Sequence, residues 1–244
     1  HSIHMSPHVA VIISKVSPKI LEFQTYNNFI VASDEVIDSI KDEIEIRAKI
    51  LRTRESSVPN EWIAHRNTIY DRENAALALQ TGELFKVSRD IAKEVIQGFS
   101  GLKGRIEMVK KLQNIEFYND ASSLTPMSTL SALKSLSVNR NIILIMGGAY
   151  TSFDYSELIK EMTTYVHTVL LLPGSGTIGQ RASLERVYNI KLLHLLNMED
   201  AVIEAYKNAN KGDIVLFSPA FDAVGIHISR KQRGEKFITA VRNL

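Results

Sequence analysis

The sequence predicts an α/β protein with a C-terminal Rossmann-like domain built on a parallel sheet, preceded by a smaller, truncated α/β domain. Three observations support this prediction. From residue 99 onward, short apolar runs alternate with helical patterns, which is typical of a parallel sheet covered on both faces. The β-branched run Val9–Ile13 is typical of a strand buried on both faces. The glycine-dense passage Gly98–Gly104 marks a boundary, giving domains 6–98 and 99–244.

The composition is ordinary for a globular protein and excludes several classes of function. The 244 residues are 45% hydrophobic and 23% charged, with a net charge of +2 and no long block of one sign. Nucleic acid is therefore not an expected partner. The absence of cysteine excludes disulfides, zinc–thiolate sites and a cysteine nucleophile. No apolar run approaches the ~20 residues of a membrane span and no signal-peptide pattern is present, so we expect a cytoplasmic protein.

The first domain combines strand and helix signals. Strands are predicted over residues 9–13, 28–32 and 48–52. Ser33-Asp34-Glu35 is typical of a helix start, and the alanine- and leucine-rich run Asn74–Leu84 predicts a longer helix. A further helix is predicted to begin at Ser88.

The second domain repeats one unit, a strand followed by a helix. Strands are predicted over residues 115–118, 141–146, 168–172, 191–195 and 214–217. Helices are predicted over residues 127–136, 155–165, 178–188 and 198–208, with a last helix from about Arg233. This order predicts that the strands run parallel.

The stretch Phe117–Pro126 is the most informative part of the chain. Its strand ends at Asn119-Asp120, and Thr125-Pro126 is typical of an N-cap followed by proline at the first helical position. A strand, a polar turn and a helix N-terminus form the usual ligand-binding arrangement of α/β proteins. The carboxylate of Asp120 suits a sugar hydroxyl or a metal-bound water. The alternative is that Asp120 only caps the turn.

Four predicted strands end at Asp120, Gly147, Gly174 and Ser218, which should all lie at the carboxyl edge of one sheet. That edge is the expected site for a small molecule. The loop Gly174–Gly179 also fits the G-x-G-x-x-G pattern of dinucleotide-binding proteins, although it follows a late strand. A dinucleotide site and a plain glycine-rich loop both remain open. His65, His167 and His194 are interpreted as packed or surface residues.

Six segments, taken in order, resemble the Mur ligase family, most closely its D-glutamate-adding members. They begin at Asn74, Phe99, Phe117, Ile145, Gly212 and Arg233, and read NAALA, FSGLKGRIE, FYND, IMGG, GDIVLFSPA and RGEKF. The resemblance implies that residues 6–98 are part of the family's central ATP-binding domain and residues 99–244 its C-terminal domain.

The resemblance implies an ATP- and Mg2+-dependent ligase. Such enzymes join an amino acid, here D-glutamate or a related one, to UDP-N-acetylmuramoyl-L-alanine during peptidoglycan synthesis, and so serve cell wall biogenesis, cell shape and cell division in the cytoplasm. ATP phosphorylates the substrate carboxylate, and the amine then attacks the acyl phosphate. The oligomeric state stays open.

The resemblance also implies roles for individual residues. Asn74 would contact adenine, Arg105 the phosphates and Asp120 the ribose. In one register Lys19 is the catalytic lysine whose carbamate helps to hold magnesium, and in another it is a surface lysine. The positions that match the family's substrate-binding residues are Ser122, Ser123, Thr151 and Ser218.

Departures from the family pattern leave two hypotheses open. No Gly-Lys-Ser/Thr P-loop and no UDP-binding domain precede residue 6, so we expect a fragment that forms no amide bond alone. Ser122 and Thr151 stand where the family has lysines, and Ala223 where it has a serine. Either the amino acid differs, or the protein is a diverged, non-catalytic relative that binds a nucleotide or a partner.

Overall fold

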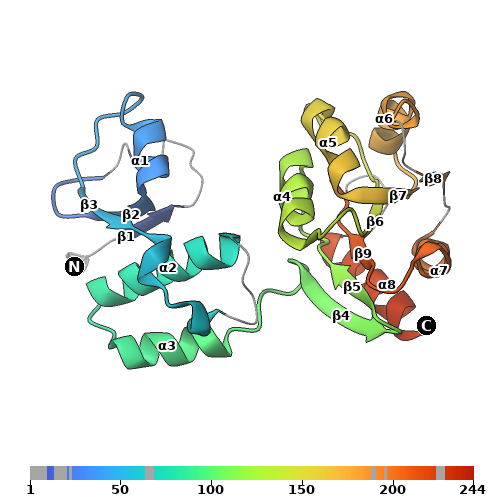
Figure 1. Cartoon of the computed structure of the whole chain (residues 1–244). Coiled ribbons are helices and arrows are strands. Elements are labelled where there is room, and N and C mark those ends of the chain that lie inside the picture. Colours follow the sequence, from blue (N-terminus) through green and yellow to red (C-terminus); the bar gives the residue numbers. More distant parts are fainter. Residues whose placement is uncertain are drawn as a thin grey trace, which may run out of the picture. The chain divides into compact units, whose positions relative to one another are not determined.

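The computed structural model describes residues 10–13, 21, 24–63, 69–187, 191–194, 197–223 and 229–244. The chain divides into two compact units, the first ending at Ser100 and the second beginning at Gly101 (Figure 1). The boundary expected after residue 98 lies two residues before this division. Among the described residues, no helix combines the length and apolar character needed to cross a bilayer.

The first unit contains a three-stranded parallel sheet in the order β1-β2-β3. Its elements are β1 (Ala10–Ile13), β2 (Phe29–Ser33), α1 (Asp34–Ile40), β3 (Lys49–Thr53), η2 (Glu55–Ser57), η3 (Asn60–Trp62), α2 (Ile69–Leu84) and α3 (Arg89–Gly98). Ser33 and Ser88 cap α1 and α3, each accepting a hydrogen bond from a backbone N–H three residues on. The predicted strands and helix starts of this unit are therefore confirmed where they fall on described residues.

The second unit contains a six-stranded sheet in the order β4-β5-β9-β6-β7-β8. The strands are β4 (Glu107–Leu112), β5 (Ile115–Asn119), β6 (Ile142–Met146), β7 (Val166–Leu171), β8 (Lys191–His194) and β9 (Ile214–Phe217). Strands β5 to β9 pair in parallel, as predicted. The C-terminal α/β fold with a parallel-dominated sheet is confirmed.

The edge strand β4 was not predicted, and it runs antiparallel to β5. The two strands are joined by Gln113 and Asn114, whose φ angles are +49° and +67°. Positive φ at both central residues is the geometry of a type I′ hairpin turn. A two-residue turn leaves no room for a crossover helix, so this pair must be antiparallel.

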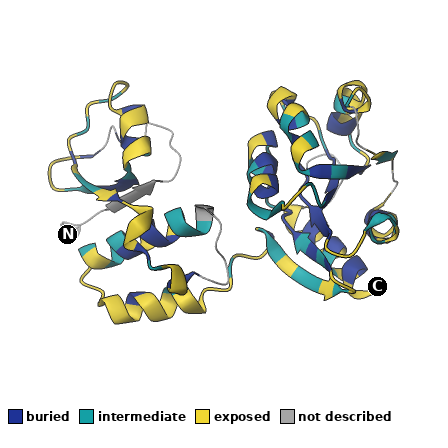
Figure 2. Ribbon diagram, viewed as in Figure 1, coloured by how far each residue is buried: buried dark blue, intermediate teal, exposed yellow. Residues whose placement is uncertain are grey.

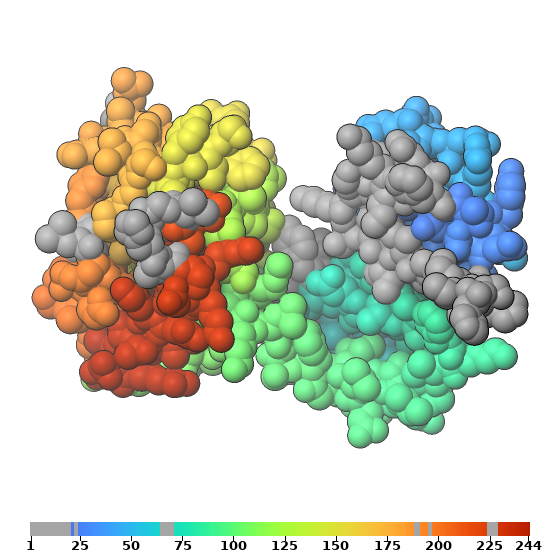
Figure 3. Space-filling view, turned by 180° about the vertical axis from the view of Figure 1, so that it is seen from behind, coloured from blue at the N-terminus to red at the C-terminus, as the bar shows by residue number. Residues whose placement is uncertain are grey.

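Helices cover both faces of this sheet (Figure 1). One layer consists of α4 (Pro126–Leu136), α5 (Ser156–Glu161) with η4 (Met162–Thr164), and α6 (Ser175–Glu185). The other consists of α7 (Met198–Asn208) and α8 (Arg230–Arg242). The buried residues of the helices face the sheet (Figure 2), and the outer side of α8 lies on the surface of the unit, in red in Figure 3.

Side chains of strand β6 pack against the helices on both faces of the sheet. Leu144 and Met146 belong to the core cluster on the α4 side, and Ile143 and Ile145 to the cluster on the α7 side. All four are at most 1% exposed. This alternation explains why the run reads as continuously apolar.

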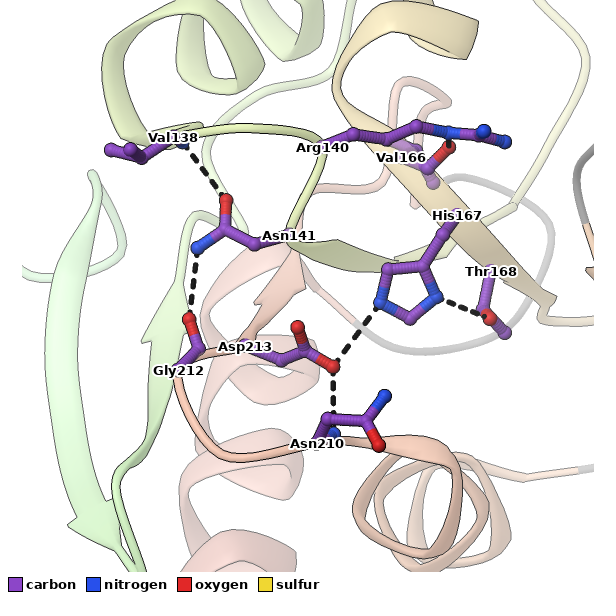
Figure 4. Close-up of polar contacts among 9 residues, drawn as sticks. All are labelled: Val138, Arg140, Asn141, Val166, His167, Thr168, Asn210, Gly212 and Asp213. Carbon is purple, nitrogen blue, oxygen red and sulfur yellow. Dashed lines mark hydrogen bonds and ion pairs between the residues drawn. The ribbon is translucent and has the colours of Figure 1, made fainter.

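The amino-terminal edge of the sheet is closed by a polar network (Figure 4). Asn141 Nδ2 donates to the Gly212 carbonyl at 2.9 Å. His167 Nε2 lies 3.3 Å from Asp213 Oδ2, and its Nδ1 lies 2.9 Å from Thr168 Oγ1. Because a carboxylate only accepts hydrogen bonds, Nε2 donates to Asp213. His167 therefore connects strand ends on the side opposite to the predicted ligand site, as expected of a packed histidine.

Candidate functional site

The carboxyl ends of β5, β9 and β6 are joined by backbone hydrogen bonds. Asp120 N donates to Phe217 O at 2.8 Å, Ser218 N to Ile145 O at 3.1 Å, and Gly147 N to Pro219 O at 3.0 Å. The ends of these strands therefore meet at one edge of the sheet, as predicted. We call the residues that follow the four strands, Asp120, Gly147, Gly174 and Ser218, the carboxyl edge.

The carboxylate of Asp120 is the centre of a buried hydrogen-bond network. Its side chain is only 2% exposed. Ser218 Oγ donates to Asp120 Oδ2 at 2.8 Å, and Ile106 N donates to Oδ1 at 3.3 Å. Thr129 Oγ1 lies 2.8 Å from Ser218 Oγ. Since Ser218 gives its single hydrogen to Asp120, Thr129 is the donor in that last contact.

Burial raises the pKa of Asp120 to about 6. Hydrogen bonds from Ser123, Ser218 and the Ile106 N–H, together with the positive charge of Arg105, favour the ionised form and limit the rise. The carboxylate is therefore buried away from water and held by a small set of donors, as is common at functional sites.

Asp120 also fixes the segment that carries Arg105. Ile106, whose N–H points at the carboxylate, has a φ of +44°. A β-branched residue rarely adopts positive φ, because its Cβ crowds the backbone. The carboxylate holds this strained conformation, and the neighbouring Arg105 side chain is exposed to solvent. Arg105 is therefore a solvent-exposed cation on a backbone that Asp120 holds in place.

A ribose hydroxyl could contact Asp120 only at a carboxylate oxygen that already accepts a hydrogen bond. Both carboxylate oxygens already accept hydrogen bonds from within the protein. A ribose hydroxyl must share an oxygen with Ser218 or with the Ile106 N–H, or replace one of them.

The four expected substrate-binding residues divide into two pairs. Ser123 and Ser218 are buried, at 8% and 0% exposure. Ser122 and Thr151 are half-buried and remain in reach of solvent. Thr151 Oγ1 lies 2.9 Å from Tyr155 Oη. Tyr155 Oη in turn donates a hydrogen bond to Ala220 O at 3.0 Å. Only Ser122 and Thr151 are therefore placed to meet a ligand without rearrangement.

Two of the expected site residues lie in the first unit or outside the described residues. Asn74 is in the first unit, exposed on α2. Lys19 lies outside the described residues. Over the parts of the chain that are described, no group of three or more His, Asp or Glu side chains is arranged to hold a metal ion.

Close packing explains two of the three glycines in the pattern Gly174–Gly179. A Cβ on Gly174 would lie 2.0 Å from Gly148 O, and one on Gly176 would lie 2.6 Å from Phe221 Cδ1. The N–H of Gly176 at the start of α6 donates to Gly148 O at 3.0 Å. Glycine is thus needed to seat this turn against the loop after β6. A Cβ on Gly179 meets nothing within 4 Å, so packing does not require glycine there, and the dinucleotide alternative stays a prediction.

Two residues that contact the carboxyl edge were not predicted from sequence. Thr129 reads as an ordinary residue of an amphipathic helix, yet it is fully buried. Arg233 enters the sequence argument only as the start of the segment RGEKF, and it is 2% exposed. Charged residues on helices are mostly solvated, so no local signal identifies a buried one.

Comparison with known proteins identifies the second unit. Residues 104–221 match the model of the Mur ligase, glutamate ligase domain. The UDP-N-acetylmuramoylalanine–D-glutamate ligase of Clostridioides difficile (strain 630) is 30% identical over 213 residues, which are 87% of this chain and 44% of that protein. The corresponding ligase of Borreliella burgdorferi (strain ZS7) is 37% identical over 152 residues, 62% of this chain and 33% of that protein.

Solved structures share the fold at low sequence identity. The MurF ligase of Thermotoga maritima in complex with ADP has a TM-score of 0.63 at 12% identity, over 99% of this chain and 64% of that one. The folylpolyglutamate synthase of Thermotoga maritima has a TM-score of 0.60 at 13% identity, over 89% of this chain and 59% of that one. The chain spans less than half the length of the curated relatives above. It belongs to the Mur ligase family, whose glutamate ligase domain it carries in residues 104–221.

Proposed function

We propose that this chain is the C-terminal part of a cytoplasmic, ATP-dependent ligase that adds D-glutamate or a related amino acid to UDP-N-acetylmuramoyl-L-alanine. A curated relative named for this reaction, which matches 87% of the chain at 30% identity, supports the assignment. The observation that carries it is the buried carboxylate of Asp120. Its hydrogen bond with Ser218 ties the ends of β5 and β9, and its hydrogen bond with the Ile106 N–H holds the backbone next to the exposed Arg105.

Each nucleotide contact has a chemical reason. The guanidinium of Arg105 is exposed and suits phosphate oxygens, for which charge-assisted bonds are strong. The amide of Asn74 suits the edge of adenine. Asp120 suits ribose hydroxyls if it shares one of its two engaged oxygens, and it otherwise acts by holding Ile106.

The proposed reaction proceeds through an acyl phosphate. A carboxylate oxygen of the muramoyl substrate attacks the γ-phosphorus of ATP, and ADP leaves. The amine of the incoming amino acid then attacks the acyl carbon, phosphate leaves with the C–O bond electrons, and the new amide loses one proton. Arg105 would stabilise negative charge on the phosphoryl oxygens. Magnesium, when bound, would neutralise further phosphate charge.

The second candidate is a diverged, non-catalytic relative that binds a nucleotide or a partner. The neutral side chains at Ser122, Thr151 and Ala223 favour it. A dicarboxylate amino acid would find no cation at these positions, although ionic partners give its strongest bonds.

Thermal melting with Mg2+ and the ATP analogue AMP-PNP tests the nucleotide site. We expect AMP-PNP to raise the midpoint of the chain, because a ligand that binds only the folded state stabilises it. Asp120→Ala and Arg105→Ala should each remove this rise, and NAD should produce none. A rise in midpoint that survives both substitutions would contradict the assignment of these residues.

Ligation assays separate the two candidates. The 244-residue chain and the longest product of its reading frame are incubated with UDP-N-acetylmuramoyl-L-alanine, ATP, Mg2+ and single amino acids. We expect no amide product from the 244-residue chain and amino-acid-dependent phosphate release from the longer product. Nucleotide binding without phosphate release from either protein would favour the non-catalytic candidate.

A further inference from the structure

Arg233 is a buried cation that spans the loops behind the carboxyl edge. It lies in the first turns of α8 and is 2% exposed. Its Nη1 donates to Gly147 O at 3.2 Å and its Nη2 donates to Phe221 O at 3.1 Å. One guanidinium therefore connects the loop after β6 to the loop after β9.

Among the residues that the structure describes, the guanidinium of Arg233 bonds to two backbone carbonyls and forms no close ion pair. Its buried Nε makes no hydrogen bond. Burial lowers the pKa of Arg233 to about 10, while the nearby Asp222 acts in the opposite direction. A buried cation is costly, and an apolar residue of similar size would usually stabilise the same space better. The contacts of Arg233 thus serve something other than packing.

The backbone that Arg233 holds, at Gly147 and Gly148, has high conformational freedom in the unfolded chain. Gly147 and Gly148 have φ angles of +133° and +154°, which L side chains rarely adopt. Two consecutive glycines lose the most conformational entropy on folding. A Cβ on Gly148 would lie 3.0 Å from Nη1 of Arg233, so the guanidinium occupies the space that a side chain would need. Glycine at position 148 thus leaves room for the Arg233 guanidinium, and the guanidinium holds the glycine backbone through Gly147 O.

The first turns of α8 also touch the end of β5. A Cβ on Gly234 would lie 3.1 Å from Asn119 Nδ2 and 3.2 Å from the Cβ of Ala121. Arg233 and Gly234 together contact the segments that follow β5, β6 and β9. The Ala149 N–H completes the link between two of them by donating to Asp222 O at 2.9 Å.

We infer that Arg233 is a positioning residue of the carboxyl edge: its two donors hold the loops after β6 and β9 together, so that the Gly147–Gly148 backbone keeps one conformation. The inference rests on the proposed function only in that this edge binds the nucleotide and the amino acid. Arg233 itself does not touch the ligand, because it is buried behind the loops. It acts by removing the freedom of two glycines before a ligand arrives, which is preorganisation.

Hydrogen exchange tests the positioning role without any ligand. Arg233→Met removes both donors, Arg233→Lys keeps the charge and one donor, and Phe237→Leu is a matched control. Phe237 is fully buried one turn further along α8 and stacks on Phe217 at 5.4 Å between ring centroids. The reporter amides are Ala149 and Gly176, which bond to Asp222 O and Gly148 O, and the reference is Val215 in central strand β9.

We expect Arg233→Met to accelerate exchange at the two reporters at least tenfold more than at Val215, and Arg233→Lys to give an intermediate acceleration. Phe237→Leu should accelerate the reporters and Val215 by similar factors. Equal factors at all three amides in Arg233→Met would overturn the inference. If Arg233→Met does not fold, the test relies on Arg233→Lys. Exchange at Ala149 and Gly176 in Arg233→Lys that is as slow as in the wild type would then overturn the inference.

An AMP-PNP titration separates this inference from the proposed function. We expect Arg233→Met to weaken AMP-PNP binding at least fivefold, Arg233→Lys to restore part of the loss, and Phe237→Leu to stay within twofold of the wild type. Equal affinity in the wild type and Arg233→Met would refute a role of the loop in binding. If the wild type binds no AMP-PNP while exchange changes as expected, the proposed function fails and the positioning role stands.

Discussion

Ser218 Oγ donates to Asp120 Oδ2 at 2.8 Å, although the two residues are 98 positions apart in the chain. The bond joins the loops after β5 and β9, and Thr129 extends it to the first turn of α4. Asp120 and Ser218 lie beneath the surface, at 2% and 0% exposure, respectively. A change to either is therefore expected to alter stability and ligand binding together.

The raised pKa of Asp120 predicts a pH-dependent stability. The folded state binds the proton more tightly than the unfolded chain, because the pKa rises from 3.8 to about 6. The contribution of this group is therefore fully present below about pH 4 and is lost as pH rises through about 6. The loss is on the order of 3 kcal/mol, since each pKa unit corresponds to about 1.4 kcal/mol.

Urea unfolding of the wild type and Asp120→Asn measures this effect. Asparagine cannot titrate, so the free energy of unfolding of the wild type relative to the variant should fall between pH 4 and pH 7. Comparing the two proteins cancels the contributions of other titrating groups. A difference that stays constant over this range would mean that Asp120 keeps its ordinary pKa in the fold.

Ser218→Ala should destabilise the protein by about 2 kcal/mol, because it leaves Asp120 Oδ2 and the Thr129 hydroxyl without their partner. Ser183→Ala, on the exposed side of α6, is the control and should change the free energy of unfolding by less than about 0.5 kcal/mol. In the Asp120→Ala background, which removes the acceptor of the Ser218 hydroxyl, the cost of Ser218→Ala should shrink, since the two residues share one network. Equal costs in both backgrounds would show that the hydrogen bond contributes nothing to stability.

Gly148→Ala and Gly179→Ala should have opposite effects. A Cβ on Gly148 would lie 2.4 Å from Asp222 O at a φ of +154°, so we expect a loss of about 3 kcal/mol or more. Gly179 lies within α6 with nothing within 4 Å of a Cβ, so alanine should stabilise the helix by about 1 kcal/mol. Thermal melting gives both values, and a destabilised Gly179→Ala would mean that the space beside α6 is occupied.

The sequence predicted the parallel part of the second unit because its central strands β6, β7 and β9 are buried on both faces and read as nearly continuous apolar runs, each followed or preceded by a helical pattern. It also predicted that Asp120, Gly147 and Ser218 would meet, since parallel strands end at the same edge. Neither inference needed a long-range contact to be known. Both follow from local patterns and the handedness of crossovers.

What the sequence could not give depends on contacts between distant segments. Strand β4 carries exposed residues such as Met108 and Lys111, so its half-buried pattern resembles a loop, and only its pairing with β5 defines it. The burial of Arg233 is set by the carbonyls of Gly147 and Phe221, which no local pattern of α8 encodes. The close approach that explains Gly174 and Gly176 is likewise visible only once the loop after β6 is in place.

The polar network at the amino-terminal edge provides a test of where ligands bind. Asp213 Oδ2 accepts hydrogen bonds from Asn210 N at 2.7 Å and from His167 Nε2 at 3.3 Å. Asp213→Ala removes both and should cost about 1–2 kcal/mol of unfolding free energy, because a partly buried N–H loses its acceptor. Asp213→Asn keeps an acceptor and should cost less.

Neither Asp213 variant should change the rise in midpoint that AMP-PNP produces, because the network joins the starts of β6, β7 and β9 and the ligand is expected at their ends. Melting curves with and without AMP-PNP measure the rise independently of the lower starting midpoint. If Asp213→Ala abolishes the rise while Asp120→Ala leaves it intact, the nucleotide binds at the amino-terminal edge and the site proposed at the carboxyl edge is wrong.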